Sequence, residues 1–230
     1  MILTGIGMPK NYTGLNLTGT MKFNGSTSTI IYTKDNDMMP NGDFTIEWYQ
    51  YQTDSNLYPR IFAIGNAAAG HIHMGVSIES GIFYFWPGNT AISFGSVGTY
   101  KNQWVHFAVS RSGSNLRVFK DGTQIGTTQT NNTNFNNPPT DLALGNEGGV
   151  VATQTAFGGW ITNFRWTKGA ALYTANFSKP LSNLAISGGN NTKLLLLALT
   201  NANVTVDSSN YTRAATASNI TWQIFNNIMV

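Results

Sequence analysis

The sequence predicts an all-β protein: an antiparallel β-sandwich of two sheets with jelly-roll topology. Turn-forming pairs such as Asn24-Gly25, Pro87-Gly88 and Asp121-Gly122 recur roughly every ten residues, the spacing of short strands in a sandwich or barrel. Between the turns, apolar and polar residues alternate with a period of two, as in strands that bury one face. No segment has the periodicity of an amphipathic helix of useful length.

The chain begins with a segment that we expect to form an extended arm. Residues 1–20 hold four glycines and Pro9 with little periodicity. Strands begin at Met21, and no convincing linker or internal repeat occurs between residues 21 and 230. The 230 residues therefore suit one arm followed by one domain, because sandwiches of this size commonly form single domains.

The first half of the domain holds several short predicted strands. The clearest is FTIEWYQYQ at residues 44–52, in which alternate side chains form two faces. One face holds Phe44, Ile46 and Trp48. The other holds Glu47, Tyr49 and Tyr51. The remaining predicted strands of this half are residues 28–33, 60–65, 72–78 and 82–86.

A hairpin and an exposed loop follow in the prediction. Residues 104–111 and 116–120 form the hairpin, and Asp121-Gly122 then turns the chain into residues 123–125. Asp-Gly favours a tight turn in which both central residues have positive φ. Residues 127–140 are almost entirely Thr, Asn and Pro, so we expect them to form an exposed loop.

The segment FGGWITNFRWTKGAALYTANF at residues 157–177 combines Gly-Gly, an aromatic strand and a Gly-Ala-Ala turn. Strict alternation puts four side chains on one face: Trp160, Thr162, Phe164 and Trp166. It puts Ile161, Asn163 and Arg165 on the other face. The final predicted strands are residues 142–145, 193–199, 204–207 and 220–225.

Charge is scarce and scattered. Only 10% of the residues are Asp, Glu, Lys or Arg, and the net charge is +3. No run of Lys or Arg occurs, so the sequence lacks the clustered basic patch of a nucleic-acid-binding protein. The chain has no cysteine, which excludes a disulfide framework or a thiolate metal site and favours assembly in a reducing cytoplasm. No signal peptide or membrane-spanning run is apparent.

Several blocks resemble the laminin-G-like domains of the concanavalin A-like lectin and glucanase superfamily. They are residues 44–48, the central hairpin from Trp104 to Gly122, residues 142–145, and Phe157-Gly158-Gly159 through Arg165. This resemblance covers roughly residues 21–200 and implies the jelly-roll sandwich. It also implies a surface built for binding, because many relatives bind sugars or calcium.

The end of the chain has a narrower likeness. Residues 165–177, the Leu-rich strand, Val206-Asp207-Ser208-Ser209 and Asn219-Ile220-Thr221-Trp222 resemble laminin-G-like domains in structural proteins of tailed phages and large DNA viruses. This likeness implies a non-enzymatic component of a virus particle, such as a minor capsid, decoration or fibre protein. Its partners would be other viral subunits or further copies of itself, and it would be assembled in the host cytoplasm. The alternative is a lectin-like module that recognises host or virion glycans.

The carboxylates do not predict catalysis. Glucanases of the superfamily need paired acids on one strand, so that one attacks while the other protonates the leaving group. The three glutamates, Glu47, Glu79 and Glu147, lie far apart in the sequence, and Asp35 and Asp37 suit a loop. We therefore assign no catalytic residues.

Metal ligands are equally sparse. His71 and His73 share a strand face, but without a third ligand nearby we interpret them as ordinary polar positions. His106 is expected to pack in the core or at its rim, and Asp121 to serve its turn. Calcium stays an option that the resemblance raises, with no ligands assigned.

Sugar binding would use exposed aromatic rings beside polar groups. The candidates are Tyr49, Tyr51 and Arg165, because each lies opposite a core-facing residue on its strand. They can contact a glycan only if their faces meet solvent, and neighbouring strands or subunits covering them is the competing interpretation.

Overall fold

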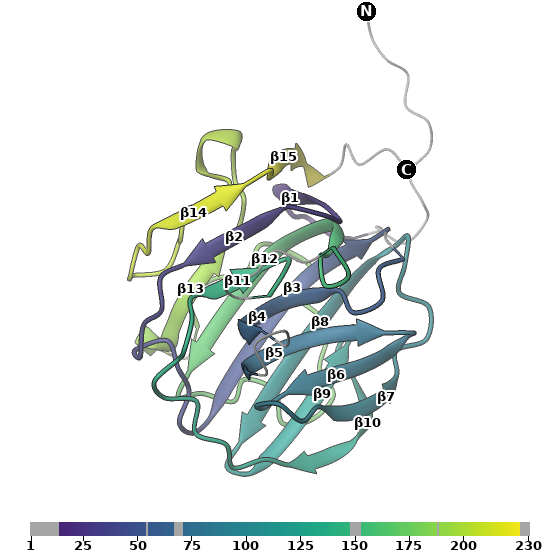
Figure 1. Ribbon diagram of the computed structural model, residues 1–230, viewed down its shortest axis with the longest axis vertical. Helices are drawn as coiled ribbons and strands as arrows, with labels where there is room; N and C mark the ends of the chain where they lie inside the picture. Colours follow the sequence, from purple (N-terminus) through teal and green to yellow (C-terminus); the bar gives the residue numbers. More distant parts are fainter. Residues whose placement is uncertain (1–13, 54, 67–70, 148–152, 188, 226–230) are drawn as a thin grey trace, which may run out of the picture.

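The computed structural model describes residues 14–53, 55–66, 71–147, 153–187 and 189–225. These residues form two antiparallel sheets stacked as layers (Figure 1). The predicted all-β sandwich is therefore confirmed. The helical residues described are two short 3-10 turns, η1 (Gly189–Asn191) and η2 (Asn201–Asn203), and no described helix could cross a membrane.

One sheet has eight strands. In spatial order they are β10 (Thr123–Thr130), β9 (Asn115–Lys120), β8 (Trp104–Ser112), β3 (Phe44–Gln52), β12 (Gly158–Lys168), β1 (Gly19–Asn24) and β15 (Thr221–Ile224), with β13 (Thr192–Leu196) also paired to β12. The other sheet has seven strands. They are β14 (Ala215–Ser218), β2 (Thr29–Tyr32), β11 (Leu142–Leu144), β4 (Arg60–Asn66), β5 (His71–Glu79), β6 (Ile82–Trp86) and β7 (Ile92–Ser96).

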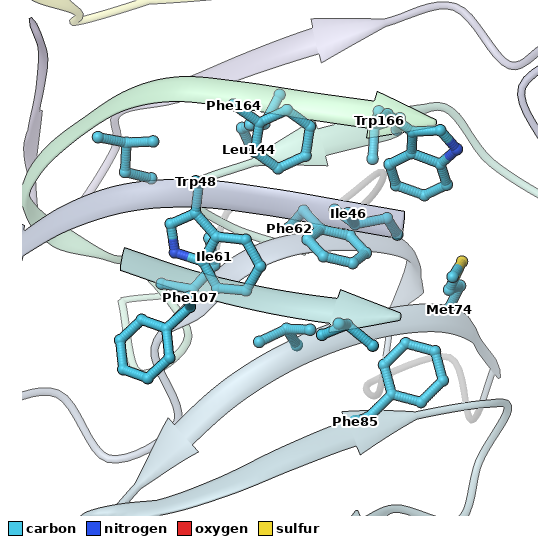
Figure 2. Packing of buried hydrophobic residues seen from close by; sticks show 14 of the residues in the cluster. Ile46, Trp48, Ile61, Phe62, Met74, Phe85, Phe107, Leu144, Phe164 and Trp166 are labelled. Atoms are coloured by element: carbon cyan, nitrogen blue, oxygen red, sulfur yellow. The ribbon is translucent and has the colours of Figure 1, made fainter. Parts of the chain in front are cut away.

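The core lies between the sheets and is rich in aromatic rings. Figure 2 shows Trp48 of β3 close to Phe62 of β4 and Phe107 of β8. The Trp48 ring centroid lies 6.3 Å from that of Phe62 and 5.9 Å from that of Phe107. Such pairs add about 1 kcal/mol each to the stabilisation from burial alone, and the Trp48–Phe62 pair joins the two sheets.

The predicted Asp-Gly turn is confirmed. Asp121 has φ +49° and Gly122 has φ +82°, as a tight hairpin turn requires. β10 then continues to Thr130, beyond the short strand expected. The exposed loop predicted for residues 127–140 is therefore partly wrong. Phe135 within it is fully buried and packs edge-on against Phe44 at 6.3 Å.

A β-bulge changes the faces predicted for the aromatic strand. The pairing of β12 with β3 shifts between Thr162 and Arg165, and Asn163 has φ +52°. Because one extra residue reverses the alternation, Ile161 joins Phe164 and Trp166 in the main core, whereas Trp160 lies on the outer side. The prediction that Trp160 and Thr162 share a face with Phe164 and Trp166 is thus wrong.

The chain ends differ in detail from the expectation. Of the predicted arm, residues 1–13 lie outside the described residues, and β1 begins at Gly19. Residues 204–207 form no strand. The last two strands are β14 and β15, and the chain passes between them from one sheet to the other at the top of Figure 1.

Candidate functional site

The outer face of the eight-stranded sheet is closed by residues 169–187, which we name the covering segment. Its backbone is held at its first residue, where Gly169 N donates to Asp43 O at 2.7 Å, and again at Leu181, whose O accepts from Asn16 N at 2.6 Å. In the middle, Phe177 N donates to Gly122 O at 2.9 Å. The side chains beneath it therefore form a second buried layer.

The three sugar-binding candidates lie in this buried layer. Tyr49 and Tyr51 are fully buried and Arg165 is 6% exposed. The Tyr49 hydroxyl donates to Pro180 O in the covering segment, and the Tyr51 ring packs against Trp104 and Trp160 at 5.8 and 5.5 Å. Tyr49, Tyr51 and Arg165 therefore do not meet the condition of solvent exposure on which their sugar-binding role depended, because the covering segment and neighbouring rings occupy that side.

Arg165 belongs instead to a buried network around Glu47. The Glu47 carboxylate accepts hydrogen bonds from Arg165 Nε at 2.9 Å, His106 Nε2 at 3.0 Å and the Tyr173 hydroxyl at 3.0 Å. Burial alone would raise the pKa of Glu47, but the hydrogen bonds and attraction of His106 and Arg165 outweigh it and hold that pKa below its usual range. Burial raises the pKa of Tyr173 above its usual range, so its hydroxyl stays a donor.

The histidines do not come together as metal ligands in the described structure. His106 is buried as expected, and His73 Nε2 contacts the Phe135 carbonyl oxygen at 2.6 Å. The side chain of His71 lies outside the described residues. Among the residues described, no three His, Cys, Asp or Glu side chains cluster in a way that could hold a metal ion.

The outer face of the seven-stranded sheet differs from that of its partner. On β6, Phe83 and Phe85 point into the core, which leaves Ile82, Tyr84 and Trp86 partly exposed on the outside. Their neighbours across the ladder are small: Tyr84 pairs with Ser77 and Ser93, and Trp86 pairs with Gly75. Large rings beside small residues make a shallow apolar platform. We name Ile82, Tyr84 and Trp86 the β6 stripe.

A chain of polar contacts holds Trp86 in place. Its Nε1 donates to Ser77 Oγ at 3.0 Å, and that hydroxyl donates to Glu79 Oε1 at 2.6 Å. The Arg60 guanidinium lies 4.5 Å from the Trp86 ring centroid, a cation–π contact. Trp86 is thus fixed along its edge and on one ring face while staying partly exposed.

Arg60 connects this chain to two carboxylates. Its Nη1 lies 3.2 Å from Glu79 Oε1, and its Nε lies 3.2 Å from Glu147 Oε1. The side chain of Glu79 is 18% exposed, whereas that of Glu147 is 2% exposed. Two catalytic carboxylates of a glycosidase must both reach the substrate. Glu147 cannot do so, because it is buried behind Arg60.

The β6 stripe was not predicted from the sequence, although the sequence holds a signal for it. IFYFW at residues 82–86 places aromatic rings on both faces of one strand. In a strand with only one face in the core, aromatic rings on the other face are not needed to pack that core. Such an excess indicates either a second layer, as on β3, or a partly exposed aromatic surface, as on β6.

Asp35 and Asp37 lie in a loop, as expected, at one rim of the sandwich. Arg213 Nη2 lies 2.7 Å from Asp35 Oδ2, and Lys193 Nζ lies 3.0 Å from Asp37 Oδ2. Hollows of about 300 and 350 Å³ flank this loop. Both carboxylates are paired with cations, so the rim is a set of surface ion pairs and not a catalytic pair.

Comparison with known families agrees with this architecture. Residues 24–172 match a laminin-G-type family model described as the concanavalin A-like lectin/glucanases superfamily. The chain belongs to that superfamily. The resemblance seen in the sequence is confirmed at this level, and the narrower likeness to virus and phage proteins stays a prediction. No curated protein sequence matches the chain.

Solved structures from several organisms have a fold similar to that of this chain. A proposed carbohydrate-binding protein of Bacteroides ovatus is similar with a TM-score of 0.64 at 14% identity, over 91% of this chain and 60% of that one. The extracellular region of zebrafish Gpr126/Adgrg6 is similar with a TM-score of 0.50 at 15% identity, over 77% and 26%. Domains LG4-5 of the mouse laminin alpha1 chain give a TM-score of 0.49 at 15% identity, over 74% and 47%. The chain thus spans 60% or less of each of these proteins, and the likeness shows the fold alone.

Proposed function

We propose that this chain is a non-enzymatic carbohydrate-binding module whose binding surface is the outer face of β6, with Glu79 of β5 beside it. The observation that carries the proposal is Trp86, a partly exposed ring fixed by Ser77 and Arg60 and paired with Gly75, which is buried and has no side chain to compete with the ring. The C–H face of a sugar ring is apolar, and covering an aromatic ring with it removes apolar surface from water. A ring that is already fixed loses little side-chain entropy on binding.

The polar groups beside the stripe supply hydrogen bonds of the right kind. Glu79 Oε1 accepts from Ser77 and Arg60, whereas its Oε2 makes no hydrogen bond within the described part of the chain. A carboxylate oxygen accepts hydrogen bonds from sugar hydroxyls. Tyr84 and Trp86 are two positions apart on one strand, about 7 Å, so a ligand of two or more sugar units could contact both.

Superfamily membership and the similarity to a proposed carbohydrate-binding protein support sugar binding more than the role in a virus particle that the sequence analysis placed first. That packing role, with its viral partners and virion location, stays a prediction. The absence of enzymatic activity is part of the proposal and rests on the burial of Glu147 behind Arg60.

A glycan array with the purified chain, followed by calorimetry on the sugars that bind, tests the proposal. Trp86→Ala should weaken binding at least about tenfold, since aromatic anchors dominate such contacts. Leu181→Ala is the control, because Leu181 is 51% exposed on the covering segment, which lies over the other sheet. Binding that survives both Trp86→Ala and Tyr84→Ala would place the site elsewhere, and a blank array would refute the function.

A further inference from the structure

The geometry points to neutral glycans, and against acidic ones, as the ligands of this face. The inference rests on the proposed function and adds to it the chemical class of the sugar. It is carried by three ionisable side chains beside Trp86: Arg60 and the two carboxylates that it contacts, Glu79 and Glu147.

The single cation of this cluster is not available to an anionic ligand. Arg60 is 3% exposed, and Trp86 covers one side of its guanidinium. Its Nη1 and Nε are committed to Glu79 and Glu147. Recognition of a sugar carboxylate usually depends on a guanidinium that presents two N–H groups from neighbouring nitrogens. In Arg60 each such pair, Nη1 with Nη2 or Nε with Nη2, includes a nitrogen that already contacts a carboxylate.

The accessible charge is negative. With one cation and two carboxylates, the cluster has a net charge of −1, and Glu79 is its most exposed member at 18%. A uronic or sialic acid lying on the β6 stripe would bring a second carboxylate close to Glu79 Oε2. Like charges at such short range repel, and the repulsion is screened little within the roughly 8 Å Debye length of physiological salt.

The hydrogen-bonding pattern selects in the same direction. The Glu79 carboxylate can only accept hydrogen bonds. It can therefore bind a sugar hydroxyl, which donates, but not a sugar carboxylate, which has no proton to donate. The net charge of the whole chain is +3, so a preference against anions would be a property of this face and not of the molecule as a whole.

The experiment compares each neutral oligosaccharide that binds with its counterpart oxidised at C6 to the uronic acid. The two ligands differ only in the carboxylate. We expect the oxidised sugar to bind about tenfold more weakly at low salt, with a smaller difference at high salt. In Glu79→Gln the ratio between the two affinities should fall toward one, because the introduced amide keeps an acceptor for Ser77 and Arg60 but carries no charge.

The outcomes separate this inference from the proposed function. No binding of either sugar would defeat the function itself. Equal or tighter binding of the oxidised sugar, lost in Trp86→Ala, would overturn the preference while keeping the site. A melting curve of Glu79→Gln within a few degrees of the wild type shows that the cluster is intact, and an unchanged ratio in that folded variant would also overturn the inference.

Discussion

Arg165 lies directly opposite Glu47 across the β12–β3 ladder, and its Nε and Nη2 both donate to the same carboxylate oxygen, Oε1. The third donor of the guanidinium, Nη1, reaches the Ala185 carbonyl in the covering segment at 2.7 Å. Glu47 Oε2 is left for His106 and Tyr173. One buried ion pair therefore joins the sheet to the segment that covers it.

Replacing Glu47 with Gln should destabilise the protein strongly. The change leaves the guanidinium of Arg165 buried without its counter-charge, which costs about 3 kcal/mol. In a chain of this length that corresponds to a fall of roughly 10 °C in melting temperature. Asp35→Asn is the matched control: its partner is also an arginine, but the Asp35 side chain is 42% exposed, and an exposed pair contributes at most about 1 kcal/mol. Equal losses in the two variants would show that burial of the pair does not matter.

The same carboxylate makes stability depend on acid. The pKa of Glu47 in the folded state lies below its value of about 4.3 in an unfolded chain. Its stabilising contribution is therefore complete above about pH 4.3 and is lost as the pH falls through the folded-state pKa. Denaturant titrations between neutral and acidic pH should show a steeper fall for the wild type than for Glu47→Gln. Parallel curves for the two proteins would contradict this account.

Local patterns predicted the strands but not which layer each face would meet. The alternation in residues 44–52 correctly separates Phe44, Ile46 and Trp48 from the opposite face. Whether Tyr49 meets solvent depends on residues 169–187, more than a hundred positions later. No periodicity within a strand contains that information, so the sequence left open whether Tyr49, Tyr51 and Arg165 are exposed or covered.

The bulge in β12 illustrates a second limit. Strict alternation assumes an unbroken ladder, and a single residue with positive φ reverses every face beyond it. Asn163 was the one residue of this strand that could have indicated the bulge, since asparagine tolerates the left-handed region better than most residues. The β6 stripe, in contrast, could have been predicted from the sequence, because IFYFW has more aromatic rings than one core face requires.

Asn163 should therefore be sensitive to both strain and hydrogen bonding. Its Oδ1 accepts from Leu184 N at 2.6 Å, and its φ is +52°. Asn163→Ala leaves a buried N–H unpaired and adds left-handed strain, which together cost about 3 kcal/mol. Asn163→Gly loses the same hydrogen bond without the strain, so its loss in chemical denaturation should be smaller by roughly 1 kcal/mol. If alanine and glycine destabilise equally, the backbone conformation of the bulge has no energetic role.

Gly122 supports both the hairpin turn and the covering segment, and the two roles can be separated. An added Cβ at Gly122, where φ is +82°, would overlap the Phe177 carbonyl oxygen. Gly113→Ala is the matched control, because its φ is +57° and nothing lies within 4 Å of the added atom. Both variants incur left-handed strain of about 1 kcal/mol, but only Gly122→Ala should also release the covering segment.

Hydrogen exchange measures that release directly. The amides of Phe177 and Gln124 donate hydrogen bonds between the turn region and the covering segment, to Gly122 O and Asn176 Oδ1 respectively, and we expect them to be protected from exchange. Both amides should exchange faster in Gly122→Ala and stay protected in Gly113→Ala, because the segment opens locally when its central contact is lost. Equal protection in the two variants would mean that Phe177 adjusts without detaching, and that Glu47 and Arg165 hold the segment closed on their own.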